Sequence, residues 1–291
     1  MITKKEKIKN YYQQSIKLNL GDIDKILHAA GVEQNKYLDE FKKLFIKSSS
    51  NIVGKWDDGK KYIRTEYVME MFGKSYPGRF LMSSVMMDSM INILDDLYDE
   101  NLTRDERKMY LIEYLRVVAI FNMLGHSERL QKSIGNYFDK LITLAVAEQA
   151  ILKEIEKAKS MKKIVKLSNK LLLMRSHDID IFVQMVLEDK SVNYLSLLDC
   201  ARCFRSINLL KKDILDLQHD IDNDQPTLVT NLRSRADFNF KVYVGELTDY
   251  FKKMLIKKKK YIKNDYKLIY NNLMKMFDNE SNVLFEILKT N

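Results

Sequence analysis

The chain has 291 residues, of which 46% are hydrophobic, so it is long enough to bury a substantial core. Only two prolines and nine glycines interrupt it, a composition that predicts an all-α protein. Its net charge of +9 is spread among interleaved acids and bases, and no nucleic-acid-binding module is present, so we expect no nucleic-acid partner. No apolar stretch reaches the roughly eighteen residues of a membrane-spanning helix. With two cysteines and no secretion signal, a cytoplasmic protein is expected.

Apolar periodicity predicts a succession of helices joined by short links. In chain order these helices cover about 3–18, 22–30, 33–48, 61–73, 78–100, 104–123, 127–158, 161–187, 191–222, 238–278 and 280–289. Thr103 followed by Glu106 fits a capping box that opens the next helix. The segment 223–237 is expected to be a loop, and a break is expected near Asn264. Because nothing resembles an interdomain linker, we expect one domain, 1–291.

The first acidic motif, Asp95, Asp96 and Asp99, ends the predicted helix 78–100. Carboxylates four apart project from one helix face. The residues before them are almost all apolar, which predicts a buried helix with buried carboxylates. Such carboxylates usually have a functional partner, although a solvated acidic patch is the alternative. Mg²⁺ prefers oxygen ligands and bridges readily to a diphosphate, so the motif indicates a magnesium site.

A second acidic cluster, Asp213, Asp216 and Asp220, lies on the predicted helix 191–222 with helical spacing. Two such rows facing each other across a cavity would bind divalent cations. The acids from Asp220 onward also resemble the start of a calcium loop, but Gln225 replaces the glycine of its turn.

Two further features have simpler interpretations. Cys200 and Cys203 form a single C-x-x-C without suitably spaced partners, so buried core thiols are expected rather than zinc ligands. The basic run Lys252–Lys263 is expected to be a solvated helix face, with peripheral contact to an anionic membrane as the alternative.

The acidic motifs resemble those of the trans-isoprenyl (polyprenyl) diphosphate synthases, which belong to the class I terpenoid synthase superfamily. The resemblance covers about residues 55–230. Asp95-Asp96-Leu97-Tyr98-Asp99 is similar to the first DDxxD motif of that family, and Gly59 to Arg64 is similar to its GGKRxR segment. Asp213 and Asp216 match the last two positions of the second DDxxD motif, and Asp220 matches an aspartate that often follows it.

The resemblance implies a role for each matching residue. Lys61 and Arg64 would hold the diphosphate of isopentenyl diphosphate. Arg104 matches the first arginine after the first motif, and Arg175 lies where a lysine of the family contacts the allylic diphosphate. The implied catalytic residues are Asp95, Asp96, Asp99, Arg104 and Arg175. The implied Mg²⁺ ligands are Asp95, Asp99, Asp213, Asp216 and Asp220.

Four positions depart from the family pattern. Lys212 replaces the first aspartate of the second motif, and we expect its ammonium to contact the diphosphate instead. Asp105 replaces the second arginine after the first motif, Asp88 replaces a histidine, and Leu209 replaces a glutamine. The allylic side of the site is thus largely intact, whereas the side that would bind isopentenyl diphosphate is eroded.

The resemblance implies a helical bundle around a central cavity and a Mg²⁺-dependent prenyltransferase that condenses an allylic prenyl diphosphate with isopentenyl diphosphate. A homodimer is expected, or a heteromeric assembly. The residues before the first motif that would close the product cavity, Met90 and Ile91, are not aromatic, so geranylgeranyl or a longer product is expected. Three alternatives stay open: a class I terpene cyclase, head-to-head condensation, and a non-catalytic subunit of a heteromeric synthase.

Overall fold

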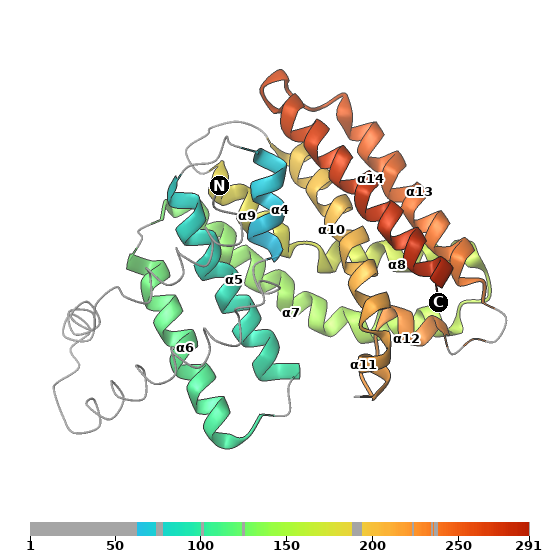
Figure 1. Ribbon diagram of the computed structural model, residues 1–291, viewed down its shortest axis with the longest axis horizontal. Helices are drawn as coiled ribbons and strands as arrows, with labels where there is room; N and C mark the ends of the chain where they lie inside the picture. Colours follow the sequence, from blue (N-terminus) through green and yellow to red (C-terminus); the bar gives the residue numbers. More distant parts are fainter. Residues whose placement is uncertain are drawn as a thin grey trace. The chain divides into compact units, whose positions relative to one another are not determined.

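The computed structural model describes residues 63–73, 78–99, 102–123, 126–187, 194–222, 224–233, 235 and 238–290. Helices account for 88% of these residues and no strand occurs among them, which confirms the all-α class (Figure 1). The helices predicted before residue 50 and the predicted substrate ligand Lys61 lie outside the described residues. The terpenoid synthase fold stays a prediction.

The chain divides into two compact units. The first comprises Met1–Glu70 and Lys74–Ser127, and the second comprises Met71–Gly73 and Glu128–Asn291. The first acidic motif belongs to the first unit and the second acidic cluster to the second. That the chain forms one domain stays a prediction.

The described part of the first unit is built from α4 (Ile63–Phe72), α5 (Gly78–Asp99) and α6 (Arg104–Met123). Most of the described apolar residues of α5 are buried, as predicted, although Leu94 is 37% exposed, and α5 packs along α6. The capping box is also confirmed. Thr103 N donates to Glu106 Oε2 at 3.0 Å, and Glu106 N donates to Thr103 Oγ1 at 3.3 Å. These two bonds satisfy backbone donors at the start of α6.

The second unit contains the remaining helices. In chain order these are α7 (Glu128–Lys157), α8 (Met161–Arg175), α9 (Asp178–Val186), α10 (Leu195–Leu215), α11 (Leu217–Asp222), α12 (Leu228–Arg233), α13 (Phe240–Lys259), η2 (Asn264–Tyr266) and α14 (Lys267–Thr290). Helix α10 lies at the centre, because it packs against α8, α9, α13 and α14 (Figure 1). Its residues Phe204, Ile207 and Leu210 are fully buried.

Four predicted boundaries in this unit are wrong. The break predicted between residues 278 and 280 does not occur, because α14 runs unbroken from Lys267 to Thr290. The helix predicted over 161–187 breaks after Arg175, where Ser176 adopts φ −75° and ψ −1° and its Oγ donates to the carbonyl of Leu173. The helix predicted over 191–222 breaks at Asp216. The predicted loop 223–237 contains α12, because Thr227 Oγ1 accepts from Thr230 N and so caps a short helix.

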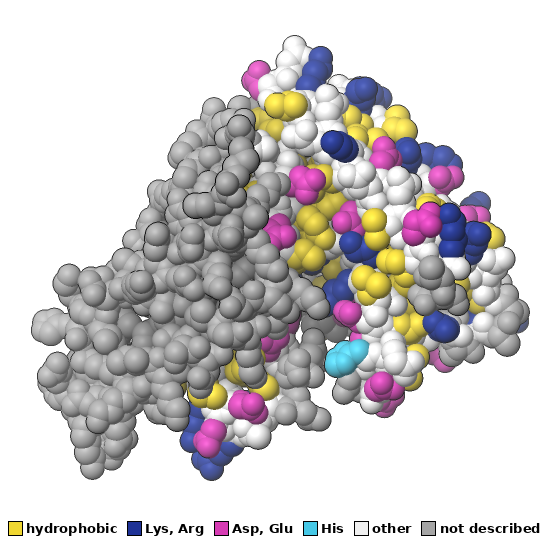
Figure 2. Space-filling model, viewed as in Figure 1, with side chains coloured by type: hydrophobic (Ala, Val, Ile, Leu, Met, Phe, Trp, Pro, Cys, Tyr) yellow, Lys and Arg dark blue, Asp and Glu magenta, His cyan; other side chains and the backbone are white. Residues whose placement is uncertain are grey.

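The basic run Lys252–Lys263 lies at the end of α13 and in the turn that follows. Most of its lysines are exposed, as expected of a solvated face, while Lys252 pairs with Asp278 at 3.0 Å. Figure 2 shows basic and acidic side chains interleaved over the face of this unit that it presents. No helix in the described part of the chain is long and apolar enough to span a bilayer. Contact with a membrane surface stays a prediction.

Cys200 and Cys203 are fully buried on α10, which confirms that they are core thiols. Burial and the neighbouring carboxylate of Asp199 raise the pKa of the Cys200 thiol to about 12. Burial also raises the pKa of Cys203. Because the thiolate is the reactive form, both residues are expected to be inert in the folded protein.

We predict that the native protein reacts with a thiol reagent at pH 8 more than about 10²-fold more slowly than the protein unfolded in urea. The single variants Cys200→Ala and Cys203→Ala give the reaction rate of each thiol separately. Equal rates in native and unfolded protein would contradict the burial of this pair.

Candidate functional site

The first acidic motif is only partly buried at the end of α5. Asp96 is 8% exposed, whereas the side chain of Asp95 is 56% exposed. The expectation that the carboxylates of the motif are buried is therefore wrong for Asp95. Asp95 lies outside the buried apolar face of α5. The side chain of Asp99 lies outside the described part of the structure.

Arg64 of α4 reaches three polar side chains along α5. Its Nη1 lies 3.2 Å from Asp88 Oδ1 and 3.4 Å from Asn92 Oδ1, and its Nη2 lies 3.9 Å from Asp95 Oδ2. These partners are three and four positions apart and so share one face of α5. The structure thus brings Arg64 next to Asp95.

Asp88, which replaces the histidine of the family, is the closest acidic partner of Arg64. Its carboxylate is fully buried and also accepts from Thr65 N at 2.8 Å and Thr65 Oγ1 at 2.6 Å. Burial raises the pKa of Asp88, while Arg64 and Thr65 act in the opposite direction. Arg64 is therefore held by a carboxylate of the protein itself.

Arg104, the other cation predicted in the first unit, is the first residue of α6 and is exposed. The capping box at Thr103 fixes the backbone from which it projects.

In the second unit, the structure joins Arg175, which the resemblance assigned to the allylic diphosphate, to Asp213, which it assigned to Mg²⁺. Arg175, the last residue of α8, donates from Nη1 to Asp213 Oδ2 at 2.6 Å and from Nη2 to Asp213 Oδ1 at 3.0 Å. This bidentate geometry is the strongest form of an arginine–carboxylate pair. The side chain of Asp213 is 4% exposed and that of Arg175 is 21% exposed. The pair therefore lies at the edge of the interior with Arg175 on the more open side.

Glu148 of α7 is a third member of this cluster that sequence reasoning missed. Burial raises the pKa of Glu148, Arg175 opposes this shift, and Asp213 adds to it. Although burial disfavours a charged guanidinium, Asp213, Glu148 and Asp178 together raise the pKa of Arg175. The sequence did indicate that Glu148 faces the interior. It shares one helix face with Ile151, Leu152 and Ile155, which are buried.

The second acidic cluster surrounds the break between α10 and α11. Asp213 lies in the last turn of α10, Asp216 occupies the break, and Asp220 is buried on α11 at 6% exposure. Burial and then the negative charges of Asp213 and Asp216 raise the pKa of Asp220. Asp213 and Asp216 are therefore both close enough to Asp220 to repel its carboxylate. Lys212 and His219 are exposed, and contact of Lys212 with a diphosphate stays a prediction.

The fit of Mg²⁺ to these residues is partial. Among the described residues, no group of three or more histidines, cysteines or acids is arranged to hold a metal ion. Both oxygens of Asp213 accept from Arg175, so Asp213 is engaged. Asp216 and Asp220 supply oxygen donors of the kind that Mg²⁺ takes, and the raised pKa of Asp220 indicates negative charge that a cation would offset.

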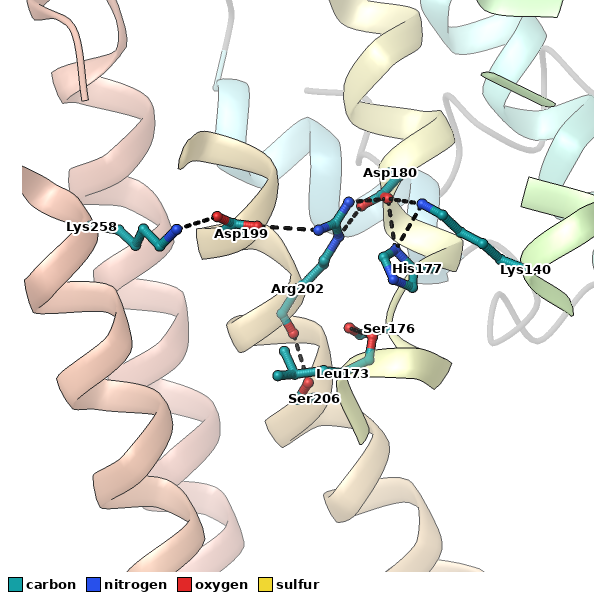
Figure 3. A network of polar contacts seen from close by, with 9 residues as sticks. All are labelled: Lys140, Leu173, Ser176, His177, Asp180, Asp199, Arg202, Ser206 and Lys258. Atoms are coloured by element: carbon teal, nitrogen blue, oxygen red, sulfur yellow. Dashed lines mark hydrogen bonds and ion pairs between the residues drawn. The ribbon is translucent and has the colours of Figure 1, made fainter. Parts of the chain in front are cut away.

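A polar network fixes the turn that carries Arg175 (Figure 3). Asp180 of α9 accepts from Arg202 Nη2 at 2.6 Å and from Arg202 Nε at 2.8 Å. His177 Nδ1 lies 2.9 Å from Asp180 Oδ2, and Lys140 Nζ lies 3.6 Å from the same oxygen. Although burial opposes ionisation, the bonds from His177 and Arg202 lower the pKa of Asp180. The network links α7, α9 and α10.

Three further ion pairs extend this arrangement. Asp199 bridges Arg202 at 3.1 Å and Lys258 of α13 at 2.5 Å (Figure 3). Arg205 forms a buried pair with Asp178, whose Oδ2 accepts from Arg205 Nη2 at 2.7 Å. The segment that follows Arg175 is therefore fixed to α10 by two arginine–aspartate pairs, Arg202 with Asp180 and Arg205 with Asp178.

Neither a model of a known protein family, nor a curated protein, nor a solved structure matches this chain.

We predict that Asp88→Leu lowers the free energy of unfolding by about 3–5 kcal/mol, because it leaves the buried guanidinium of Arg64 without its carboxylate. The double variant Arg64→Met with Asp88→Leu should lose less than the sum of the two single variants. Urea unfolding provides the measurement. Asp105→Leu, at an exposed position of the same unit, is the control and should change stability by less than about 0.5 kcal/mol. Additive effects of Arg64→Met and Asp88→Leu would contradict the coupling.

Asp220→Asn is predicted to raise the Tm at neutral pH. The pKa of Asp220 is higher in the folded than in the unfolded state, so the folded state binds this proton more tightly. At a pH above the pKa that Asp220 has in the folded protein, the ionised carboxylate lowers the stability of the wild type. As the pH falls from that pKa toward 3.8, the carboxylate takes up a proton and the difference in Tm between variant and wild type disappears. Thermal unfolding of both proteins at a series of pH values measures the difference. Asp222→Asn, exposed on the same helix, controls for the loss of one charge, and an identical profile in the two variants would contradict the prediction.

Proposed function

We propose that this protein is a Mg²⁺-dependent enzyme that ionises an allylic prenyl diphosphate and condenses it with isopentenyl diphosphate. One observation carries the proposal. Arg175, which the resemblance assigned to the allylic diphosphate, and Asp213, which it assigned to Mg²⁺, are 38 positions apart in the sequence and lie 2.6 Å from each other. Asp216 and Asp220 are within electrostatic range of the same carboxylate.

The proposed reaction begins when the bond between the prenyl C1 and the diphosphate oxygen breaks, and the electron pair leaves with the diphosphate. Arg175 would bind the leaving group, because its guanidinium is charged and partly exposed. Asp213 and Glu148 would hold this guanidinium in place before the substrate binds. A preorganised charge of this kind contributes roughly 10²–10³ in rate.

Asp216 and Asp220 would hold Mg²⁺, with Asp95 and Asp99 as the ligands implied by the first motif; when bound, the ion supplies positive charge that stabilises the leaving diphosphate. The double bond of isopentenyl diphosphate would then attack the allylic cation, and the product would lose a proton. Water must be excluded, because it would trap the cation as an alcohol.

A class I cyclase is the second candidate, and the Arg64–Asp88 pair favours it. Condensation would need Arg64 to hold the diphosphate of isopentenyl diphosphate. Asp88 and Thr65 form a buried set of partners that already neutralises and fixes this end of α4. An arginine paired in this way attracts a second diphosphate less strongly than an unpaired one. Ionisation of a single substrate would not require Arg64 at all.

The deciding experiment incubates the protein with Mg²⁺ and geranyl, farnesyl or geranylgeranyl diphosphate, with and without isopentenyl diphosphate. Elongated products that require isopentenyl diphosphate would support condensation. Consumption of an allylic diphosphate without it, with release of diphosphate and a hydrocarbon or alcohol, would support the cyclase. If no allylic diphosphate is consumed under either condition, the proposal of catalysis is overturned.

We predict that Asp216→Ala, Asp95→Ala and Asp99→Ala each lower turnover by at least about 10²-fold, because each removes an expected contact to the metal. Arg175→Ala should lower it comparably, and Arg175→Lys should recover part of the loss, since lysine keeps the charge but not the bidentate geometry. Asp222→Ala, exposed beside the second cluster, is the matched control and should retain turnover. Near-normal turnover of a folded Asp216→Ala variant would exclude the second cluster from catalysis.

A further inference from the structure

A second pocket lies within the second unit, beside the break between α10 and α11. Its volume is about 210 Å³. Residues of α10, α11, α12, α13 and α14 line it, together with two residues of the link before α13. This volume is smaller than the roughly 300–1,000 Å³ of sites for drug-sized molecules, so it suits a short chain or the end of a longer one.

The floor of this pocket is apolar. Ile214, Leu217, Val229 and Leu232 all line it, and each is at most 7% exposed. Phe238 adds an aromatic wall, which packs on Tyr243 with ring centroids 5.3 Å apart. Water gains few hydrogen bonds on such a surface, whereas an aliphatic chain gains the free energy of apolar burial.

The rim of the pocket is cationic. Arg233, Arg235 and Lys241 line it, and no carboxylate occurs among the described residues that do so. Arg235 is held in place, because its Nη1 donates to the carbonyl of Ala158 at 2.8 Å and its guanidinium lies 5.9 Å from the ring centroid of Phe238. Arg233 and Lys241 are exposed.

The larger groove between α13 and α14 provides a contrast. It has a volume of about 420 Å³ and carries the carboxylates of Glu246, Asp249 and Asp278 with a single lysine, Lys252. Lys252 pairs with Asp278 across the two helices. Its net negative charge does not suit an anion, so the distinguishing feature of the smaller pocket is an apolar floor combined with three cationic side chains and no carboxylate among the described residues that line it.

We propose that the smaller pocket binds an amphiphilic anion, with an apolar chain on its floor and a carboxylate or phosphate headgroup at Arg233, Arg235 and Lys241. The binding uses no metal and none of the residues assigned to catalysis, so it does not depend on the proposed function. Two sources supply this chemistry, a fatty acid and an isoprenoid phosphate.

Isothermal titration calorimetry in the presence of EDTA tests the proposal with decanoate and with geranyl phosphate. The matching alcohols, decanol and geraniol, have the same chains without the charge. At least one anion should bind saturably and about tenfold or more tightly than its alcohol, because the cationic rim contacts only the headgroup. The tighter of the two anions identifies the source.

The double variant Arg233→Glu with Lys241→Glu should weaken anion binding at least about tenfold. The matched control is Lys253→Glu with Lys257→Glu, which makes the same change in net charge at exposed positions of α13 that do not line the pocket. The control should bind within about twofold of the wild type. Both double variants change exposed side chains, and their Tm values report whether the fold is kept.

Four outcomes would overturn the proposal. The first is that neither anion binds saturably, and the second is that each anion binds no more tightly than its alcohol. The third is that the two double variants lose the same amount of anion affinity. The fourth is that Arg175→Ala loses anion affinity while Arg233→Glu with Lys241→Glu does not. The last result would assign the binding to the candidate site instead.

Discussion

The second unit depends on the arginine–aspartate pairs that join α10 to the break between α8 and α9. Helix α10 is surrounded by other helices, so any charge on it must be paired or lose the free energy of its hydration. Arg202 and Arg205 pair with Asp180 and Asp178, and Asp213 pairs in the opposite sense with Arg175. Each pair fixes the position of the break between α8 and α9 relative to α10. The pairs of Arg202 with Asp180 and of Arg205 with Asp178 hold the segment that follows Arg175. They therefore fix the orientation of Arg175 and of the candidate site.

The two arginines that the resemblance assigned to diphosphates differ in how readily they can change partners. Arg64 is 9% exposed, and its partner Asp88 is fully buried and held by two further bonds from Thr65. Arg175 is 21% exposed, and its partner Asp213 shares a neighbourhood with two other carboxylates. A diphosphate carries more negative charge than one carboxylate, so it can compete for Arg175 at the open side of the pair. For Arg64, the same exchange would leave Asp88 buried beside no cation, which is costly. Arg175 is therefore better suited than Arg64 to bind a diphosphate.

The sequence predicted those features that local rules control. The start of α6 follows from the capping box at Thr103, and the burial of α5 follows from its continuous apolar residues. The breaks at Ser176 and Asp216 were missed because neither has a proline or glycine, and both residues keep a φ in the ordinary negative range. Glu148 and the partners of Arg202 were missed for another reason. Charged residues can be read from a sequence, but which of them meet across 22 positions depends on how the helices pack. Arg175 and Asp213 were found only because a resemblance to a family supplied their positions.

Asp220 connects the stability of the second unit to its proposed chemistry. A buried carboxylate whose pKa is raised by two neighbouring carboxylates lowers the stability of the fold when it is ionised. The arginine closest to this cluster, Arg175, is engaged by Asp213 in a bidentate pair, so it offsets only part of the negative charge. A cation bound at Asp216 and Asp220 would remove the repulsion, and the free energy that the fold loses through these residues would then favour binding. Functional sites are where such local conflicts are expected in a protein whose other features agree with its fold. The break in the helix at Asp216 has the same interpretation, because it places this carboxylate between two helices rather than within one.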